Sequence, residues 1–163
     1  MRASGGLIFL ITLLPLVASA QTDDHFKSQG YVYFAPGVEA EGAATAHIGG
    51  GGEWFFSPKA GIGAELGYIA ALQDFRDGIG TFSPNLVALF RPNRRETKVR
   101  PFFTGGYTLF FRNGAANGVN LGGGVNYWFN ERCGLRFEVR DNFVFAGGES
   151  EMSLNFRIGL TFR

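Results

Sequence analysis

The C-terminal segment Glu151-Met-Ser-Leu-Asn-Phe-Arg-Ile-Gly-Leu-Thr-Phe162 alternates between two kinds of residue along its whole length. Apolar residues stand at every even-numbered position, and polar or small residues stand between them. Successive side chains of a β-strand point to opposite faces of a sheet, so a period of two predicts a strand. The two faces of this strand are expected to meet very different surroundings.

The preceding segment repeats the pattern. One face carries Leu135, Phe137, Val139, Phe143 and Phe145, with the acidic Asp141 as the exception, and the other carries Arg136, Glu138, Arg140 and Asn142. Six earlier segments complete a set of eight: 30–38, 44–56, 60–71, 81–91, 100–111 and 118–129. Their lengths, roughly nine to twelve residues, are those that a tilted transmembrane strand needs.

The breaks between the segments are of two kinds. The polar stretches 57–59, 92–98 and 130–132 follow even-numbered strands and are expected to be periplasmic turns. The stretches 37–44, 73–80, 112–117 and 146–150 are expected to be outer loops. An even number of strands places both chain termini on the periplasmic side.

The N-terminus has the features of an export signal. Arg2 precedes an apolar stretch at 7–17 that is too short to span a bilayer, and Ala18-Ser19-Ala20 offers a small-x-small cleavage pattern. An uncleaved N-terminal anchor is the alternative, and the short apolar length argues against it. We expect a cleaved signal peptide at 1–20 and a single domain at 21–163.

The bulk composition excludes some classes of protein. The 15 Lys and Arg residues nearly balance the 14 Asp and Glu residues, so no net charge steers nucleic acid to the surface. Cys133 is the single cysteine and cannot form an intramolecular disulfide. The 18 phenylalanines favour β-structure, and the 25 glycines disfavour long helices. No residues stand in a pattern that predicts a catalytic, cofactor or metal site.

Charged residues and glycines distinguish a membrane barrel from a soluble one. Within the strands, charges fall on the face opposite the aliphatic and aromatic residues: Glu53, Glu65, Arg136, Glu138, Arg140 and Arg157. Glycines at 61, 63, 67, 122, 124 and 159 share that face and leave room for long side chains. A soluble ligand-binding periplasmic barrel is the alternative, but it needs bulky apolar residues at these positions. We predict an internal Glu/Arg network.

Aromatic residues gather near the strand ends on the expected periplasmic side. They predict an interfacial girdle of Trp54, Phe56, Phe90, Tyr127, Trp128, Phe129 and Phe162, with Tyr31, Tyr33, Phe55, Phe102 and Phe103 at the same level. A second set, comprising Phe75, Phe82, Phe111, Phe143 and Phe145, is expected at the outer interface. The predicted fold class is all-β: an eight-stranded antiparallel up-and-down transmembrane β-barrel.

Gly122-Gly-Gly-Val-Asn-Tyr-Trp-Phe129, a short polar turn, and Gly134-Leu-Arg-Phe-Glu-Val-Arg-Asp141 resemble the OmpA-like, opacity-type family of small outer-membrane β-barrel domains. Gly49 to Phe56, Gly61 to Tyr68, and Arg100-Pro-Phe-Phe103 also resemble strands of that family. The resemblance covers the mature chain and implies the outer membrane of a Gram-negative bacterium. It also implies contact with lipopolysaccharide, and with the barrel-assembly machinery through the C-terminal strand. That machinery reads a final aromatic residue, whereas Arg163 follows Phe162 here.

The expected role is structural or interactive rather than enzymatic. The buried charges could instead line a narrow pore for small ions or solutes, although eight strands leave little open lumen. A third hypothesis is a lipid-modifying outer-membrane enzyme, with His47 as base and Ser83 and Asp74 near the same rim. No spacing singles out these three residues. No cofactor and no external ligand is predicted.

Overall fold

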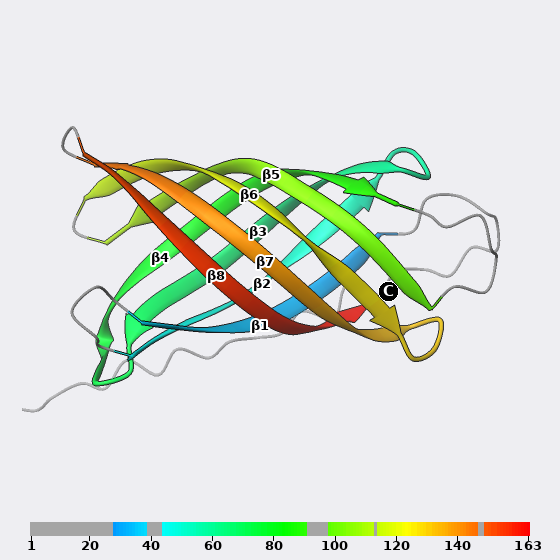
Figure 1. Cartoon of the computed structure of the whole chain (residues 1–163), viewed down its shortest axis with the longest axis horizontal. Coiled ribbons are helices and arrows are strands. Elements are labelled where there is room, and N and C mark those ends of the chain that lie inside the picture. Colours follow the sequence, from blue (N-terminus) through cyan, green and yellow to red (C-terminus); the bar gives the residue numbers. More distant parts are fainter. Residues whose placement is uncertain (1–27, 39–43, 91–97, 113, 147–148) are drawn as a thin grey trace, which may run out of the picture.

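The computed structural model describes residues 28–38, 44–90, 98–112, 114–146 and 149–163. The expected signal peptide lies outside the described residues. Eight antiparallel strands form a closed barrel in sequence order (Figure 1), which confirms the predicted fold class. They are β1 Gln29–Val38, β2 Ala44–Phe55, β3 Ala60–Ala71, β4 Asp74–Leu89, β5 Val99–Phe111, β6 Ala115–Trp128, β7 Cys133–Ala146 and β8 Glu149–Phe162.

The barrel closes by pairing its first strand with its last. Gly30 of β1 stands opposite Phe162 of β8, and Phe34 stands opposite Ile158. The backbone N–H of Arg163 donates to the carbonyl of Arg132 at 2.9 Å, which places the C-terminus beside the β6–β7 turn. Closure leaves no sheet edge along the paired stretch, as a strand structure in a bilayer requires.

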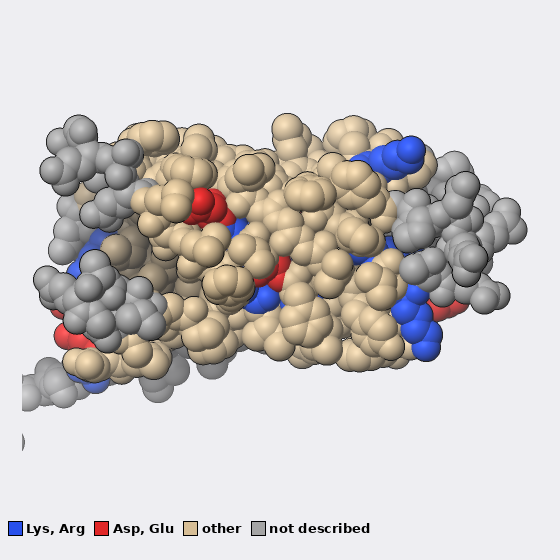
Figure 2. Space-filling view, in the orientation of Figure 1, with Lys and Arg blue, Asp and Glu red and all other residues tan. Residues whose placement is uncertain are grey.

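Alternation along the strands produces two contrasting surfaces. Exposed apolar side chains point outward from all eight strands, among them Val32, Trp54, Leu66, Leu86, Phe103, Leu121, Val139 and Phe156. Figure 2 shows one side of the barrel as a mostly uncharged wall, with a few acidic and basic atoms visible within it. The buried residues on the inner face are mainly polar or charged. The structure therefore has an apolar exterior and a polar interior.

Three strands start two or more residues earlier than the sequence analysis predicts. β4 begins at Asp74, β6 at Ala115 and β8 at Glu149, all within segments expected to be outer loops. The β3–β4 connection consists of Leu72 and Gln73, since Ala71 pairs with Asp74. Polar and glycine-rich residues such as Asp77 and Gly78 favour turns. In β4 they stand beside a register irregularity in its pairing with β3, between Ile69 and Ala71.

Five aromatic residues point the opposite way from the predicted girdle. Tyr31, Tyr33, Phe55, Phe102 and Trp128 are buried inside the barrel. Each has the parity of the inward face, and Tyr33 also stands opposite Gly49, in the middle of β2. Trp128 is two residues from the buried Asn126 and is 6% exposed, whereas Trp54 is 55% exposed. The other predicted girdle residues, Phe56, Phe90, Tyr127, Phe129 and Phe162, are exposed.

Inward glycines make room for two of these rings. An added Cβ at Gly49 would stand 2.6 Å from the hydroxyl of Tyr33, and one at Gly51 would stand 2.9 Å from the hydroxyl of Tyr31. Side chains at these β2 positions would collide with rings that reach across from β1. The glycine-rich run of β2 thus allows two tyrosines to lie inside the narrow barrel.

Candidate functional site

All six charged residues predicted for the interior are buried inside the barrel. They come from four strands: Glu53 from β2, Glu65 from β3, Arg136, Glu138 and Arg140 from β7, and Arg157 from β8. Three acids face three bases, so the set is electrically balanced. This balance matters because an uncompensated buried charge is strongly destabilising.

The six side chains form one chain of alternating charge, here called the ion-pair network. Arg136 bridges Glu53, at 2.9 Å, and Glu138, at 3.0 Å. Arg140 then connects Glu138, at 2.5 Å, to Glu65, at 3.2 Å. Arg157 ends the chain, with its Nη1 2.8 Å from Oε1 of Glu65.

Glu65 is the most highly connected member of the network. The hydroxyls of Tyr31 and Tyr33 donate to its two carboxylate oxygens, each at 2.9 Å. Arg140 and Arg157 donate to the same carboxylate. These donors come from β1, β7 and β8, so one carboxylate on β3 connects the two ends of the chain across the barrel. Charge-assisted hydrogen bonds of this kind are stronger than neutral ones.

Arg136 connects the rest of the ion-pair network to the apolar end of the interior. Its guanidinium stands 3.8 Å from the ring centre of Phe102 and 4.2 Å from that of Tyr31. Beyond it, four buried residues form an apolar cluster: Phe55, Val87, Leu89 and Phe102. Stacking on aromatic faces stabilises a desolvated guanidinium. The lumen on this side is therefore filled by side chains.

His47 lies inside the barrel rather than at a catalytic rim. Its Nε2 is 2.8 Å from the hydroxyl of Tyr33, which already donates its only proton to Glu65. Nε2 must then carry the hydrogen, and Nδ1 faces Nη2 of Arg157 at 3.5 Å. Both ring nitrogens of His47 are engaged by the network and its neighbours.

The residues suggested as partners of His47 do not assemble around it. Ser83 hydrogen-bonds Thr108 at 3.0 Å, and Asp74 is exposed at the start of β4. A nucleophile and an orienting carboxylate would have to stand within hydrogen-bond reach of the base. The hypothesised catalytic set of His47, Ser83 and Asp74 is not formed.

On the opposite side of the interior, the buried polar residues are uncharged. Buried polar residues of β4, β5 and β6 are Thr81, Ser83, Asn85, Thr104, Thr108, Asn120 and Asn126. Asn120 donates to Asn85 at 2.9 Å and to Thr108 at 3.0 Å. The described residues contain no cluster of His, Cys, Asp and Glu that could hold a metal ion. Among the same residues, no α-helix has the length and apolar content to span a bilayer.

No family model matches this sequence, and no curated protein matches it. Solved structures do match the fold. The N-terminal β-barrel domain of Pseudomonas aeruginosa OprF is 14% identical with a TM-score of 0.59, covering 85% of this chain and all of that domain. Neisserial surface protein A is 13% identical with a TM-score of 0.60, covering 84% of this chain and 96% of the other.

A third match is the outer-membrane enzyme PagL, which is 15% identical with a TM-score of 0.53 and covers 82% of this chain and 99% of PagL. At these identities the likeness shows the fold alone. The chain has the fold of small eight-stranded outer-membrane β-barrels. That fold carries different activities in its members, so the role of this chain must be argued from its own residues.

Sequence reasoning missed the tyrosines that complete the network. The sequence analysis predicts Tyr31 and Tyr33 at the level of the interfacial girdle, but both share the inward face of β1 with Gln29. Their parity was readable in the sequence, because each is two residues from the next inward position. Gln29, whose amide donates to Glu53 at 2.5 Å, was also missed.

Proposed function

We propose that this protein is an integral outer-membrane β-barrel of a Gram-negative bacterium with a structural or interactive role. The observation that carries the proposal is the contrast between the two faces of the wall. Large apolar side chains are exposed on every strand, while the ion-pair network is buried. A soluble protein rarely exposes an apolar surface of this extent, whereas a lipid-facing barrel requires one.

We further propose that the chain is an OmpA-like, opacity-type barrel. The support is the motif resemblance in segments 122–129 and 134–141, together with a fold that matches other small outer-membrane barrels. In this proposal the lipid-facing wall contacts lipopolysaccharide, and β8 is the strand recognised by the assembly machinery. Residues on the outer connections would contact any external partner.

A structural role is favoured over a pore by the way the interior is filled. The apolar cluster of Phe55, Val87, Leu89 and Phe102 and the stacked Arg136 occupy one end of the lumen. We expect purified, folded protein in planar bilayers to show no resolvable conductance. Discrete, reproducible channel openings would instead favour the alternative role as a narrow pore for small ions or solutes.

A structural role is also favoured over catalysis. His47 is held by Tyr33 and Arg157, and Ser83 bonds Thr108. These contacts hold His47 and Ser83 on separate partners, so the two residues do not form a pair of base and nucleophile. We therefore propose no enzymatic activity and no cofactor.

The membrane assignment is tested by fractionation followed by electrophoresis with and without boiling. We expect the protein in the outer-membrane fraction, with a band that migrates differently after heating, because a closed barrel resists detergent until it is heated. A soluble periplasmic protein with no heat-dependent shift would contradict the proposal. It would make a soluble ligand-binding barrel the better account.

A further inference from the structure

The closing seam between β1 and β8 is paired over only part of its length. Within the described residues, the pairing starts at Gly30 and Phe162 and ends at Phe34 and Ile158. Residues 35–38 of β1 continue to pair with β2 but have no partner on β8. Figure 1 shows β1 and β8 diverging toward the left of the view, away from the C-terminus. The outer part of the seam is therefore a gap in the barrel wall, here called the notch.

A proline stands in β1 where the pairing with β8 has ended. Pro36 is two residues beyond Phe34 and is in register with Ala46 of β2. Proline has no backbone N–H to donate, so within sheets it is confined to edges and bulges. Because the β2 side of β1 is paired here, the unpartnered side is the one toward β8. The sequence thus favours an end to the pairing at this point.

Inward-facing residues of β8 are uncovered beside the notch. Ser153 and Asn155 have the parity of the buried Arg157, and Ser153 stands in register with the inward Asn142 of β7. Asn142 is 5% exposed, whereas Ser153 is exposed and Asn155 is half-buried. An opening at the outer mouth alone would uncover Asn142 as well. Ser153 is therefore reached from the side of β8 that β1 leaves open.

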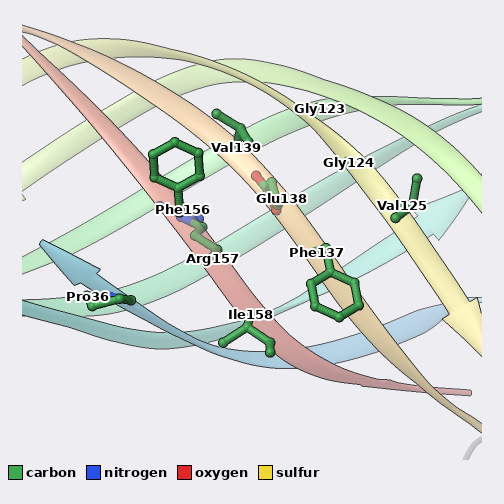
Figure 3. A pocket seen from close by; sticks show the side chains of 10 residues that line it. All are labelled: Pro36, Gly123, Gly124, Val125, Phe137, Glu138, Val139, Phe156, Arg157 and Ile158. Atoms are coloured by element: carbon green, nitrogen blue, oxygen red, sulfur yellow. The ribbon is translucent and has the colours of Figure 1, made fainter.

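An apolar hollow of about 420 Å³ lies on the outer wall at the inner corner of the notch. It is lined on one side by Pro36 and on the other by Phe156 and Ile158, and it continues over β7 and β6. Figure 3 shows β1 and β8 meeting near Ile158 and separating toward Pro36 and Phe156. Phe156 directly follows Asn155, so the hollow and the polar side of the notch meet at one strand edge. Pockets for small molecules have volumes of about 300–1,000 Å³.

The chemistry of the two sides defines the molecule that fits. The outer side is apolar, and the accessible groups of the inner side, Ser153 and Asn155, are uncharged. Together they can both donate to and accept from a hydroxyl group. A charged head group would have no counter-charge there, because the three acids and three bases of the ion-pair network already balance one another. The unpaired backbone groups of β8 also require partners at membrane depth.

We propose that the notch is a lateral portal and binding site for a small, single-chain amphipathic molecule with an uncharged hydroxyl head. The head enters the barrel and hydrogen-bonds Ser153 and Asn155, while the chain lies in the hollow between Pro36 and Phe156. Such a molecule passes between bilayer and barrel interior through the wall rather than through the outer mouth. This role goes beyond contact of the wall with lipid, and it rests on the proposed outer-membrane location.

The first measurement tests whether the seam is open, using cysteine pairs in a Cys133→Ser background in phosphatidylcholine nanodiscs. If the register continued, Gly37 would face Asn155 as Val32 faces Leu160. A disulfide needs its two Cα atoms within about 7 Å. On oxidation we expect Val32→Cys/Leu160→Cys to form a disulfide, and Gly37→Cys/Asn155→Cys to stay reduced. Equal disulfide formation in both pairs would show a sealed seam and overturn the inference.

The cysteine variants also test for a different occupant of the notch. A disulfide between two molecules of the single variant Asn155→Cys would assign the free edge of β8 to a second copy of this chain. That result would likewise overturn the inference. We expect Asn155→Cys to remain a monomer on oxidation.

The second measurement identifies the occupant by photolabelling in the same nanodiscs. The probe is decanol with a diazirine beside its hydroxyl, and mass spectrometry locates the labelled residues. We expect labelling of Ser153 and Asn155 that excess decanol suppresses and excess decane does not. Ser153→Phe fills the inner side of the notch and should lose the label at Asn155. Leu154→Phe, which adds an aromatic ring to the opposite face of β8, is the matched control and should keep it.

Two outcomes of the labelling would overturn the inference. Label confined to outward-facing residues in the wild type would show that the probe stays in the bilayer. Equal suppression by decane and decanol would show that no hydroxyl head is recognised. Both results would leave the membrane assignment intact, whereas failure of the wild type to insert into the nanodiscs would contradict the proposed function itself.

Discussion

The two sides of the barrel interior are stabilised in different ways. On the side of β2, β3, β7 and β8, six charged residues form a continuous ion-pair network. On the side of β4, β5 and β6, the buried polar groups are uncharged and are joined by pairwise hydrogen bonds such as Asn120–Asn85. The charged side depends on the presence of every member, because each carboxylate balances an arginine. The uncharged side should tolerate the loss of a single polar side chain.

The charged side also includes the closing seam of the barrel. Arg157 and Glu65 are 92 residues apart in sequence, yet they form a direct ion pair. Tyr31 and Tyr33 bring β1 into the same network. Together with these tyrosines, the network links β1, β2, β3, β7 and β8.

The largest effect is expected for Glu138→Gln. Glu138 separates Arg136 from Arg140, so its neutralisation leaves two buried guanidinium groups with one fewer counter-charge. Loss of one partner of a buried pair typically costs about 3–5 kcal/mol. The urea midpoint of unfolding should fall accordingly. Glu131→Gln in the exposed β6–β7 turn is the control and should leave the midpoint unchanged; equal midpoints for both variants would contradict a buried network.

A smaller effect is expected for Gly67→Ala. The added Cβ would stand 2.7 Å from the Tyr33 hydroxyl and 2.5 Å from Nε2 of His47, forcing these two groups apart. Overpacking of this kind costs about 2 kcal/mol. At Gly52 an added Cβ would meet nothing closer than a carbonyl oxygen at 3.9 Å. Unfolding in urea should therefore separate Gly67→Ala from Gly52→Ala, and identical midpoints would place Gly67 outside the packed interior.

The smallest effect is expected on the uncharged side. Asn120→Ala removes the hydrogen bonds to Asn85 and Thr108 and strands the Asn85 amide oxygen, at a cost of about 1 kcal/mol. The same urea titration measures it. A loss as large as that of Glu138→Gln would contradict this difference, because the two sides would then depend equally on their polar contacts.

Much of this architecture was predictable from sequence, because strand periodicity reports directly on the two faces of a barrel wall. The parity of residues such as Glu65 and Arg157 is visible in the alternation. The alternation does not reveal which glutamate pairs with which arginine. That pairing depends on the register of the closed sheet, which brings residues 65 and 157 together. Trp128 shows the other limit: its depth suggested a girdle position, but its parity places it inside.

The two tryptophans offer the most direct test of the inside and outside assignments. Trp54 is 55% exposed on the outer wall, and Trp128 is 6% exposed inside the barrel, where the Arg163 guanidinium stands 3.7 Å from its ring centre. Variants Trp128→Phe and Trp54→Phe each leave one tryptophan, whose fluorescence is measured in bilayers of brominated phospholipid. The account predicts strong quenching of Trp54 and little quenching of Trp128. Equal quenching, or stronger quenching of Trp128, would contradict an apolar outer wall around a polar interior.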